Sequence, residues 1–118
     1  MTMAFPGTYN INYYEGDTYE FKIYPKDSTG ATFDLTGYSV KFFIATATGP
    51  SGTQFECLAT IGPDSVVSCT IPPGVGRTLV AGTPYFYDVE VTKAGSPTKV
   101  YTLLAGSISV TADVTGAV

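Results

Sequence analysis

The chain has 118 residues, which suits one domain and is long enough to bury a core without a metal or a dense disulfide framework. Only 14% of the residues are charged, the net charge is −4 and the six cations are scattered, so the composition excludes a nucleic-acid surface of clustered lysine and arginine. The sequence has no histidine, which excludes His-dependent catalytic triads and His-ligated metal sites.

Residues 1–7 form the first predicted segment, an N-terminal arm. The arm is apolar and lacks the basic region and long apolar core of a secretory signal. No stretch of the chain approaches the length of a transmembrane helix, so we expect no membrane contact. Exposed apolar segments usually mark contacts, which makes Met3 and Phe5 predicted contacts with a partner protein. The alternative is that the arm folds back over the domain.

Residues 8–13 are the first predicted strand, at the edge of a sheet. Three tyrosines, Tyr9, Tyr13 and Tyr14, gather near this edge. Tyrosine packs its ring and offers its hydroxyl at sheet edges and subunit contacts, so we predict that they touch a partner. Stacking on a sugar is the alternative. Few charges protect this edge, which favours pairing with a partner strand.

Alternation of apolar and polar residues predicts the next strands at 18–24 and 38–45. Two turns lie between them, at 27–30 and 34–37. Each turn begins with Asp, whose side chain bonds nearby backbone amides, and ends with Gly, which tolerates a positive φ.

The two cysteines lie on the two strands of a predicted hairpin, 55–61 and 66–71. If the hairpin is symmetric about Pro63, Cys57 faces Cys69. We interpret both as small buried hydrophobic residues. The alternative is a cross-strand disulfide formed after lysis exposes the protein to oxidant.

A short helical turn near residues 75–80 is predicted to cap the end of the sheet, because Val75, Leu79 and Val80 have helical spacing. The strand that follows, 85–92, points its tyrosines and valines inward and Phe86, Asp88 and Glu90 outward.

The last predicted strand covers residues 98–112, and residues 113–118 form a C-terminal tail. The even positions of this strand, among them Val100 and Ile108, are predicted to keep one face apolar. Gly106 indicates either a β-bulge or a close approach of another backbone segment.

These elements predict an all-β fold, an immunoglobulin-like antiparallel β-sandwich of about seven strands over residues 8–112. The antibody hallmarks are missing, since the chain has no tryptophan and its cysteines lie on neighbouring strands. Tyr85 or Tyr87 is the candidate for the tyrosine corner of such folds.

Four short motifs carry a resemblance to a known family. They are Gly16-Asp17-Thr18, Leu35-Thr36-Gly37-Tyr38, Tyr87-Asp88-Val89 and Gly106-Ser107-Ile108-Ser109-Val110. In their residues and their order along the chain, these motifs resemble the immunoglobulin-like structural domains of tailed bacteriophages, in particular the N-terminal domain of lactococcal-type upper-baseplate proteins. The resemblance runs from Tyr9 to Val110. The baseplate proteins carry long C-terminal extensions, whereas this sequence stops at Val118.

The resemblance implies a non-enzymatic virion structural protein, made in the cytoplasm of a bacterial host and mounted on the capsid, tail or baseplate. Its implied partners are other virion proteins and further copies of itself. A surface filled by Thr, Ser and Gly in place of charges is also typical of proteins covered by neighbours. The alternative function is a carbohydrate-binding module that recognises a host glycan.

Catalytic and metal-binding candidates are few. Glu15/Asp17 and Asp88/Glu90 are carboxylate pairs spaced by two, which is typical of a solvated strand face and not of a glycosidase cleft. Calcium at Asp17 or in the Asp27 turn lacks the dense oxygen ligands of a dedicated loop, so turn formation is the better interpretation. We expect no enzymatic activity and no cofactor.

Overall fold

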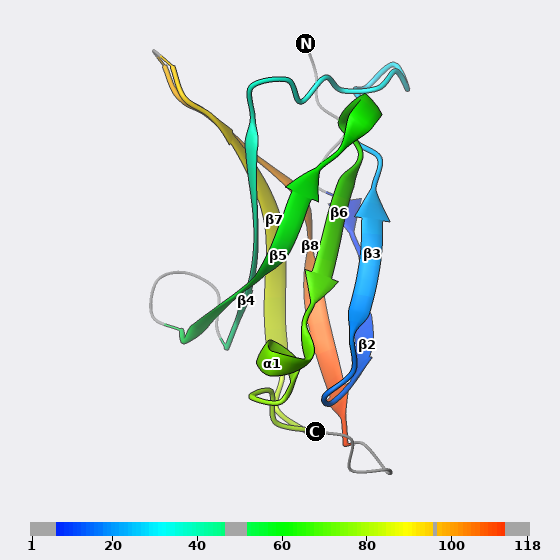
Figure 1. The fold of residues 1–118 in the computed structure, drawn as a ribbon, viewed down its shortest axis with the longest axis vertical. Coiled ribbons are helices and arrows are strands. Elements are labelled where there is room, and N and C mark those ends of the chain that lie inside the picture. The colour runs from blue at the N-terminus through cyan, green and yellow to red at the C-terminus, as the bar shows by residue number, and fades with distance from the viewer. Residues whose placement is uncertain (1–6, 47–51, 96, 113–118) are drawn as a thin grey trace.

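The computed structural model describes residues 7–46, 52–95 and 97–112, and over these residues the chain is built almost entirely of strands (Figure 1). The strands are β1 Gly7–Thr8, β2 Ile11–Tyr14, β3 Tyr19–Ile23, β4 Ser39–Ala45, β5 Gln54–Ile61, β6 Val67–Ile71, β7 Tyr85–Lys93 and β8 Lys99–Thr111. Two short helical turns, η1 Pro63–Ser65 and α1 Pro73–Gly76, connect them. The predicted all-β class is therefore confirmed.

The strands form one curled, mixed sheet in the order β1-β8-β7-β4-β5-β6-β3, and β2 also pairs with β8. β1 and β2 run parallel to β8, whereas the other pairs are antiparallel. The curl is made by β5, whose residues 54–57 pair with β4 and whose residues 58–61 pair with β6. In Figure 1, β5, β6 and β3 consequently lie in front of β4, β7 and β8.

The two halves of the curled sheet enclose the core. The ring of Phe21 on β3 meets Phe42 on β4 at 5.4 Å and Tyr87 on β7 at 6.3 Å, both edge-on. Phe42 has no exposed surface at all. Burying such a side chain contributes about 1.5–3 kcal/mol of hydrophobic stabilisation, so these contacts fix β3 across from β4 and β7.

The predicted alternation is confirmed on β7. Tyr85, Tyr87, Val89 and Val91 are buried, whereas Phe86 and Asp88 are exposed on the opposite face. Successive residues of a strand point to opposite faces, so one strand lines both the core and the outer surface.

The two predicted aspartate turns are confirmed as well. In the second turn, the Asp34 carboxylate accepts hydrogen bonds from the Thr36 amide at 2.9 Å and the Thr36 hydroxyl at 2.6 Å. These bonds lower the pKa of Asp34. Gly37 closes the turn with φ +84°, a conformation that favours glycine. Asp27 and Thr29 repeat the arrangement in the first turn.

The opening strand is not continuous, which corrects the prediction of one strand over residues 8–13. It breaks between β1 and β2, where the Tyr9 carbonyl lies against Gly106: a Cβ on Gly106 would be 2.1 Å from the Tyr9 oxygen. Of the two roles predicted for Gly106, close backbone approach is thus the correct one.

The bulge lies at Leu103 instead, because Val89 pairs with Leu104 while Glu90 pairs with Thr102. An extra residue turns the following side chains to the other face. Before the bulge the odd positions point inward, so Leu103 is buried and Val100 is 51% exposed. The expectation that Val100 shares an apolar face with Ile108 is therefore wrong.

The predicted helical turn lies slightly earlier in the chain than residues 75–80. Prolines at 72 and 73 begin α1, whose amides at Gly76 and Arg77 bond back to the Pro72 and Pro73 carbonyls. Leu79, just after α1, is buried, whereas Val80 is exposed. Most of the arm and the whole tail 113–118 lie outside the described residues.

Candidate functional site

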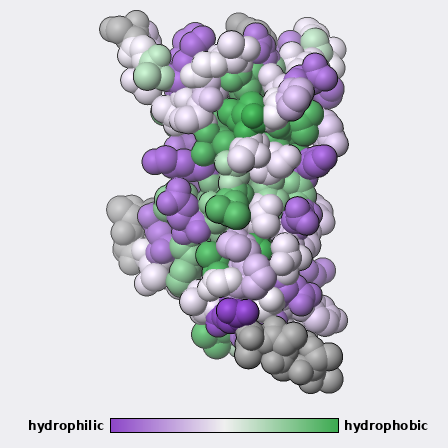
Figure 2. Space-filling model, viewed as in Figure 1, coloured by the Kyte–Doolittle hydropathy of each residue, from purple (hydrophilic) through white to green (hydrophobic). Residues whose placement is uncertain are grey.

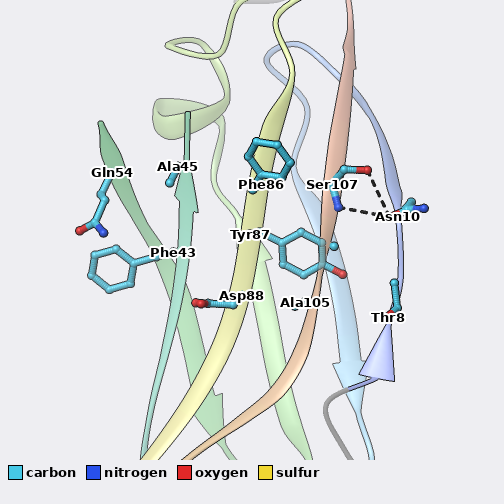
Figure 3. A pocket seen from close by; sticks show the side chains of 11 residues that line it. Thr8, Asn10, Phe43, Ala45, Gln54, Phe86, Tyr87, Asp88, Ala105 and Ser107 are labelled. Carbon is cyan, nitrogen blue, oxygen red and sulfur yellow. Dashed lines mark hydrogen bonds between the residues drawn. The ribbon is translucent and has the colours of Figure 1, made fainter. Parts of the chain in front are cut away.

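A groove of about 500 Å³ runs over the outer face of β4, β7 and β8 (Figure 3). Its lining comes from five strands and the β1–β2 break: Thr8, Asn10, Phe43, Ala45, Gln54, Phe86, Tyr87, Asp88, Ala105, Gly106 and Ser107. The side of the sheet opposite the core therefore has a recess of its own.

The strand register sets the shape of this groove. One row across the sheet places Phe43, Asp88 and Ala105 side by side, and the next row places Ala45, Phe86 and Ser107 side by side. Phe43 and Phe86 are therefore diagonal neighbours, and Ala45 and Asp88 occupy the other diagonal. The small side chains of Ala45, Ala105 and Ser107 leave the hollow, and Phe43 and Phe86 stand beside it as its aromatic walls.

The opposite wall is held in place by Asn10, at the break between β1 and β2. Its Oδ1 accepts hydrogen bonds from the Ser107 amide at 3.2 Å and from the Ser107 hydroxyl at 3.1 Å. The side chain thereby satisfies a β8 amide next to the break in the strand. Figure 3 shows its amide nitrogen directed away from Ser107.

Tyr87 lies between Phe86 and Asp88 in the groove lining, but its ring points to the inner face of the sheet and packs on Phe21 and Phe42. Its hydroxyl donates a hydrogen bond to the Tyr9 carbonyl at 2.6 Å, and burial raises the pKa of Tyr87 well above its usual value. The phenol is therefore a neutral structural donor, which ties the β1–β2 break to β7.

Asp88 is the one carboxylate that lines the groove. Its side chain extends from β7 toward β4, on the side of Phe43 (Figure 3). Asp88 is exposed, but its neighbours partly desolvate the carboxyl, and this desolvation raises the pKa of Asp88. No lysine or arginine is among the lining residues, so the groove presents hydrogen-bond acceptors and donors beside aromatic rings with a weakly acidic character.

The three tyrosines predicted as contacts differ in the structure. Tyr9 and Tyr14 are 49% and 53% exposed, so both rings are accessible from outside. Tyr13 is only 1% exposed, and its hydroxyl donates to the Asp17 carbonyl at 2.5 Å. Its role as a surface contact is therefore wrong, because inward alternation on β2 places it in the core. The arm residues Met3 and Phe5 lie outside the described residues.

The symmetric cysteine hairpin is also wrong. Cys69 pairs with Ala59, and Cys57 pairs with Phe42 on the other neighbouring strand. Asp64 and Ser65 take φ +58° in η1, which centres the hairpin on Asp64. Both thiols are buried and free, as the interpretation of small hydrophobic residues expects, and burial raises the pKa of each to about 12. Neither thiol is activated as a nucleophile.

The other carboxylates form no metal site within the described part of the chain, where no group of three or more potential ligands occurs. Asp27 Oδ1 accepts hydrogen bonds from the Thr29 amide at 2.9 Å and the Ala31 amide at 3.2 Å, which is the geometry of turn formation. Asp88 and Glu90 share the outer face of β7, as predicted.

Several groove residues were not identified from the sequence. Phe86 and Asp88 were predicted to point outward, but Phe43, Gln54 and Asn10 were not singled out. The sequence signal for the groove was an outward-pointing aromatic residue on each of two strands, Phe43 on β4 and Phe86 on β7. The sequence does not show that these two strands are neighbours or that their register places Phe43 and Phe86 on one diagonal.

None of the helices among the described residues has the length and apolar character needed to cross a membrane.

The described residues thus define an all-β domain with an aromatic-lined groove on one face of its sheet. No family model and no curated protein matches the sequence. Among solved structures, the chain is similar to a nucleoside hydrolase-related hypothetical protein from Saccharophagus degradans that is associated with carbohydrate metabolism. The match has 14% identity and a TM-score of 0.38, and it covers 86% of this chain but 22% of that protein.

Proposed function

We propose that the chain is a non-enzymatic structural module of a tailed-bacteriophage particle, with an immunoglobulin-like β-sandwich as its fold. The strand order is the observation that carries the fold. Immunoglobulin-type sandwiches place strands B, E and D in one sheet and C, F and G in the other. The orders β3-β6-β5 and β4-β7-β8 follow the same scheme in chain sequence.

Tyr85 adds independent support for this fold. It begins β7, the strand that corresponds to F, and its hydroxyl accepts a hydrogen bond from the Val80 amide at 2.8 Å. A tyrosine at the start of strand F that bonds the backbone a few residues upstream is the tyrosine corner of immunoglobulin-like domains. Between the two sequence candidates, Tyr85 has this geometry.

The composition of the surface supports a protein that is in contact with other proteins. Figure 2 shows hydrophobic atoms on the face of β5, β6 and β3, mixed with weakly polar ones, while strongly hydrophilic residues lie mainly at its margins. Leu58 and Tyr24 are both exposed there. Large exposed apolar side chains in a low-charge surface favour contact with other proteins. The phage assignment itself rests on the four sequence motifs.

The proposal is tested by lysing a bacterial culture that produces the phage carrying the gene for this chain and sedimenting the particles from the lysate. The chain should co-sediment with intact particles on a density gradient and remain bound after a wash in high salt. Recovery of the chain only in the soluble fraction, with particles complete without it, would refute the structural role.

A further inference from the structure

We propose that the groove over β4, β7 and β8 binds a neutral oligosaccharide, with Phe43 and Phe86 as stacking surfaces and Asp88 and Gln54 as hydrogen-bonding groups. This function goes beyond the structural role proposed above. The sequence suggested a different sugar site, formed by Tyr9, Tyr13 and Tyr14 near the first strand. Tyr13 is buried in the core and cannot contribute to a site there.

The dimensions of the groove suit a short sugar chain. Its volume of about 500 Å³ lies in the range of small-molecule sites, which is about 300–1,000 Å³. Most of the lining belongs to β4, β7 and β8, which pair without a register shift at residues 43–45, 86–88 and 105–107, so the groove is a preformed feature of the sheet. A preformed site loses little free energy to ordering when it binds.

The side chains offer the two kinds of contact that a sugar ring needs. The apolar C–H face of a pyranose packs on an aromatic ring, and Phe86 is exposed on the outer face to receive it. Sugar hydroxyls are both donors and acceptors. Gln54 offers both functions through its amide, and Asp88 accepts.

The electrostatics of the groove favour a neutral ligand. Asp88 lines it without any cation among the lining residues, so an anionic sugar would be repelled. A crowded carboxylate is costly to leave without partners, and two neighbouring hydroxyls of a sugar would supply charge-assisted hydrogen bonds. Phosphate-bearing ligands and nucleic acids are disfavoured for the same reason.

The experiment is a two-dimensional NMR titration of the full chain with neutral gluco-, galacto- and manno-hexasaccharides, followed by calorimetry with the best ligand. We expect at least one sugar to shift amides of β4, β7 and β8 in the groove. Phe86→Ala and Asp88→Asn should each weaken binding by about tenfold or more, as truncation of central contact residues does. Tyr24→Ala removes an exposed ring away from the groove and should bind as the parent does.

A cooperative melt for each variant shows that the fold is kept, and Gln54→Ala serves as a third groove variant should Phe86→Ala fail to fold. Absence of shifts with all three sugars at millimolar concentration would overturn the inference, and so would shifts confined to another face. The same variants are tested for particle attachment. Variants that lose attachment but bind the sugar as the parent does would make the groove a protein contact and overturn the inference. Groove variants that still attach to the particle but no longer bind the sugar would support both the structural role and the sugar site.

Discussion

Phe42 is the side chain on which the packing of the two halves of the sheet depends most directly. It is fully buried, and its ring lies 5.4 Å from Phe21 and 5.8 Å from Tyr87. We predict that Phe42→Ala lowers the free energy of unfolding by about 3–5 kcal/mol, a large part of the about 5–15 kcal/mol typical of a domain. Urea denaturation measures the loss.

Phe86→Ala is the matched control for this prediction, because Phe86 occupies an exposed position on β7. Its effect on stability should be small. A Phe42→Ala protein that melts cooperatively within a few degrees of the parent would show that the assigned inner face of β4 is wrong.

Asp88 should make stability depend on pH. Partial desolvation by its neighbours raises the pKa of Asp88 in the folded protein above the value of about 3.9 for Asp in an unfolded chain. Below that value the carboxyl is protonated in both states. As the pH rises through the folded-state pKa, the unfolded state ionises more readily, and stability is lost.

We therefore predict that Asp88→Asn is more stable than the parent at neutral pH and equal to it near about pH 3. Denaturation at both pH values checks this difference. If Asp88→Asn raised the free energy of unfolding equally at both pH values, the charge of the carboxylate would not be the cause of the gain.

At the level of elements, β1 and β2 differ from the other strands because they pair with β8 in parallel. Gly106 permits this pairing, since a Cβ there would lie 2.1 Å from the oxygen and 2.9 Å from the carbon of the Tyr9 carbonyl. Neither backbone atom can move without shifting the strand. We predict that Gly106→Ala destabilises the protein by about 1–3 kcal/mol and speeds hydrogen exchange of the β2 amides.

Gly74→Ala is the control for this prediction. Its Cβ would meet nothing within 4 Å, and it lies in the helical turn α1, where Ala is preferred. Its stability should equal or exceed that of the parent. Unchanged exchange in β2 of the Gly106→Ala protein would contradict the role assigned to the close approach.

The sequence predicted elements better than it predicted their partners. Alternation on β4 and β7 was enough to assign inner and outer faces, because a period of two has only two phases. The bulge was missed, since Leu103 and Leu104 are adjacent apolar residues and either can point inward. The cysteine register was missed because Asp64 and Ser65 adopt positive φ, which few non-glycine residues do.

The groove could not be predicted for a related reason. Its walls combine outward residues of β4, β5, β7 and β8 with Asn10 at a strand break. Of these residues, only Phe86 and Asp88 were predicted from the sequence to point outward. The proximity of the groove residues follows from long-range pairing, which no local pattern specifies.

At the scale of the whole molecule, attachment to a particle is expected to involve the N-terminal arm. Deleting residues 1–6 leaves β1 and β2 in place. We predict that the shortened protein keeps the parent's unfolding transition but no longer joins the particle, because the arm supplies apolar contact residues such as Met3 and Phe5. Particle binding assays and thermal melts measure the two effects. A shortened protein that loses stability and still attaches would show that the arm packs on its own domain.

The copy number of the chain on purified particles tests the structural account most directly. Quantitative mass spectrometry against the major capsid protein gives this ratio. A structural module occupies symmetric positions, so we predict the same fixed ratio in every preparation and after repeated purification. A trace amount that varies between preparations and falls with each purification step would contradict the account.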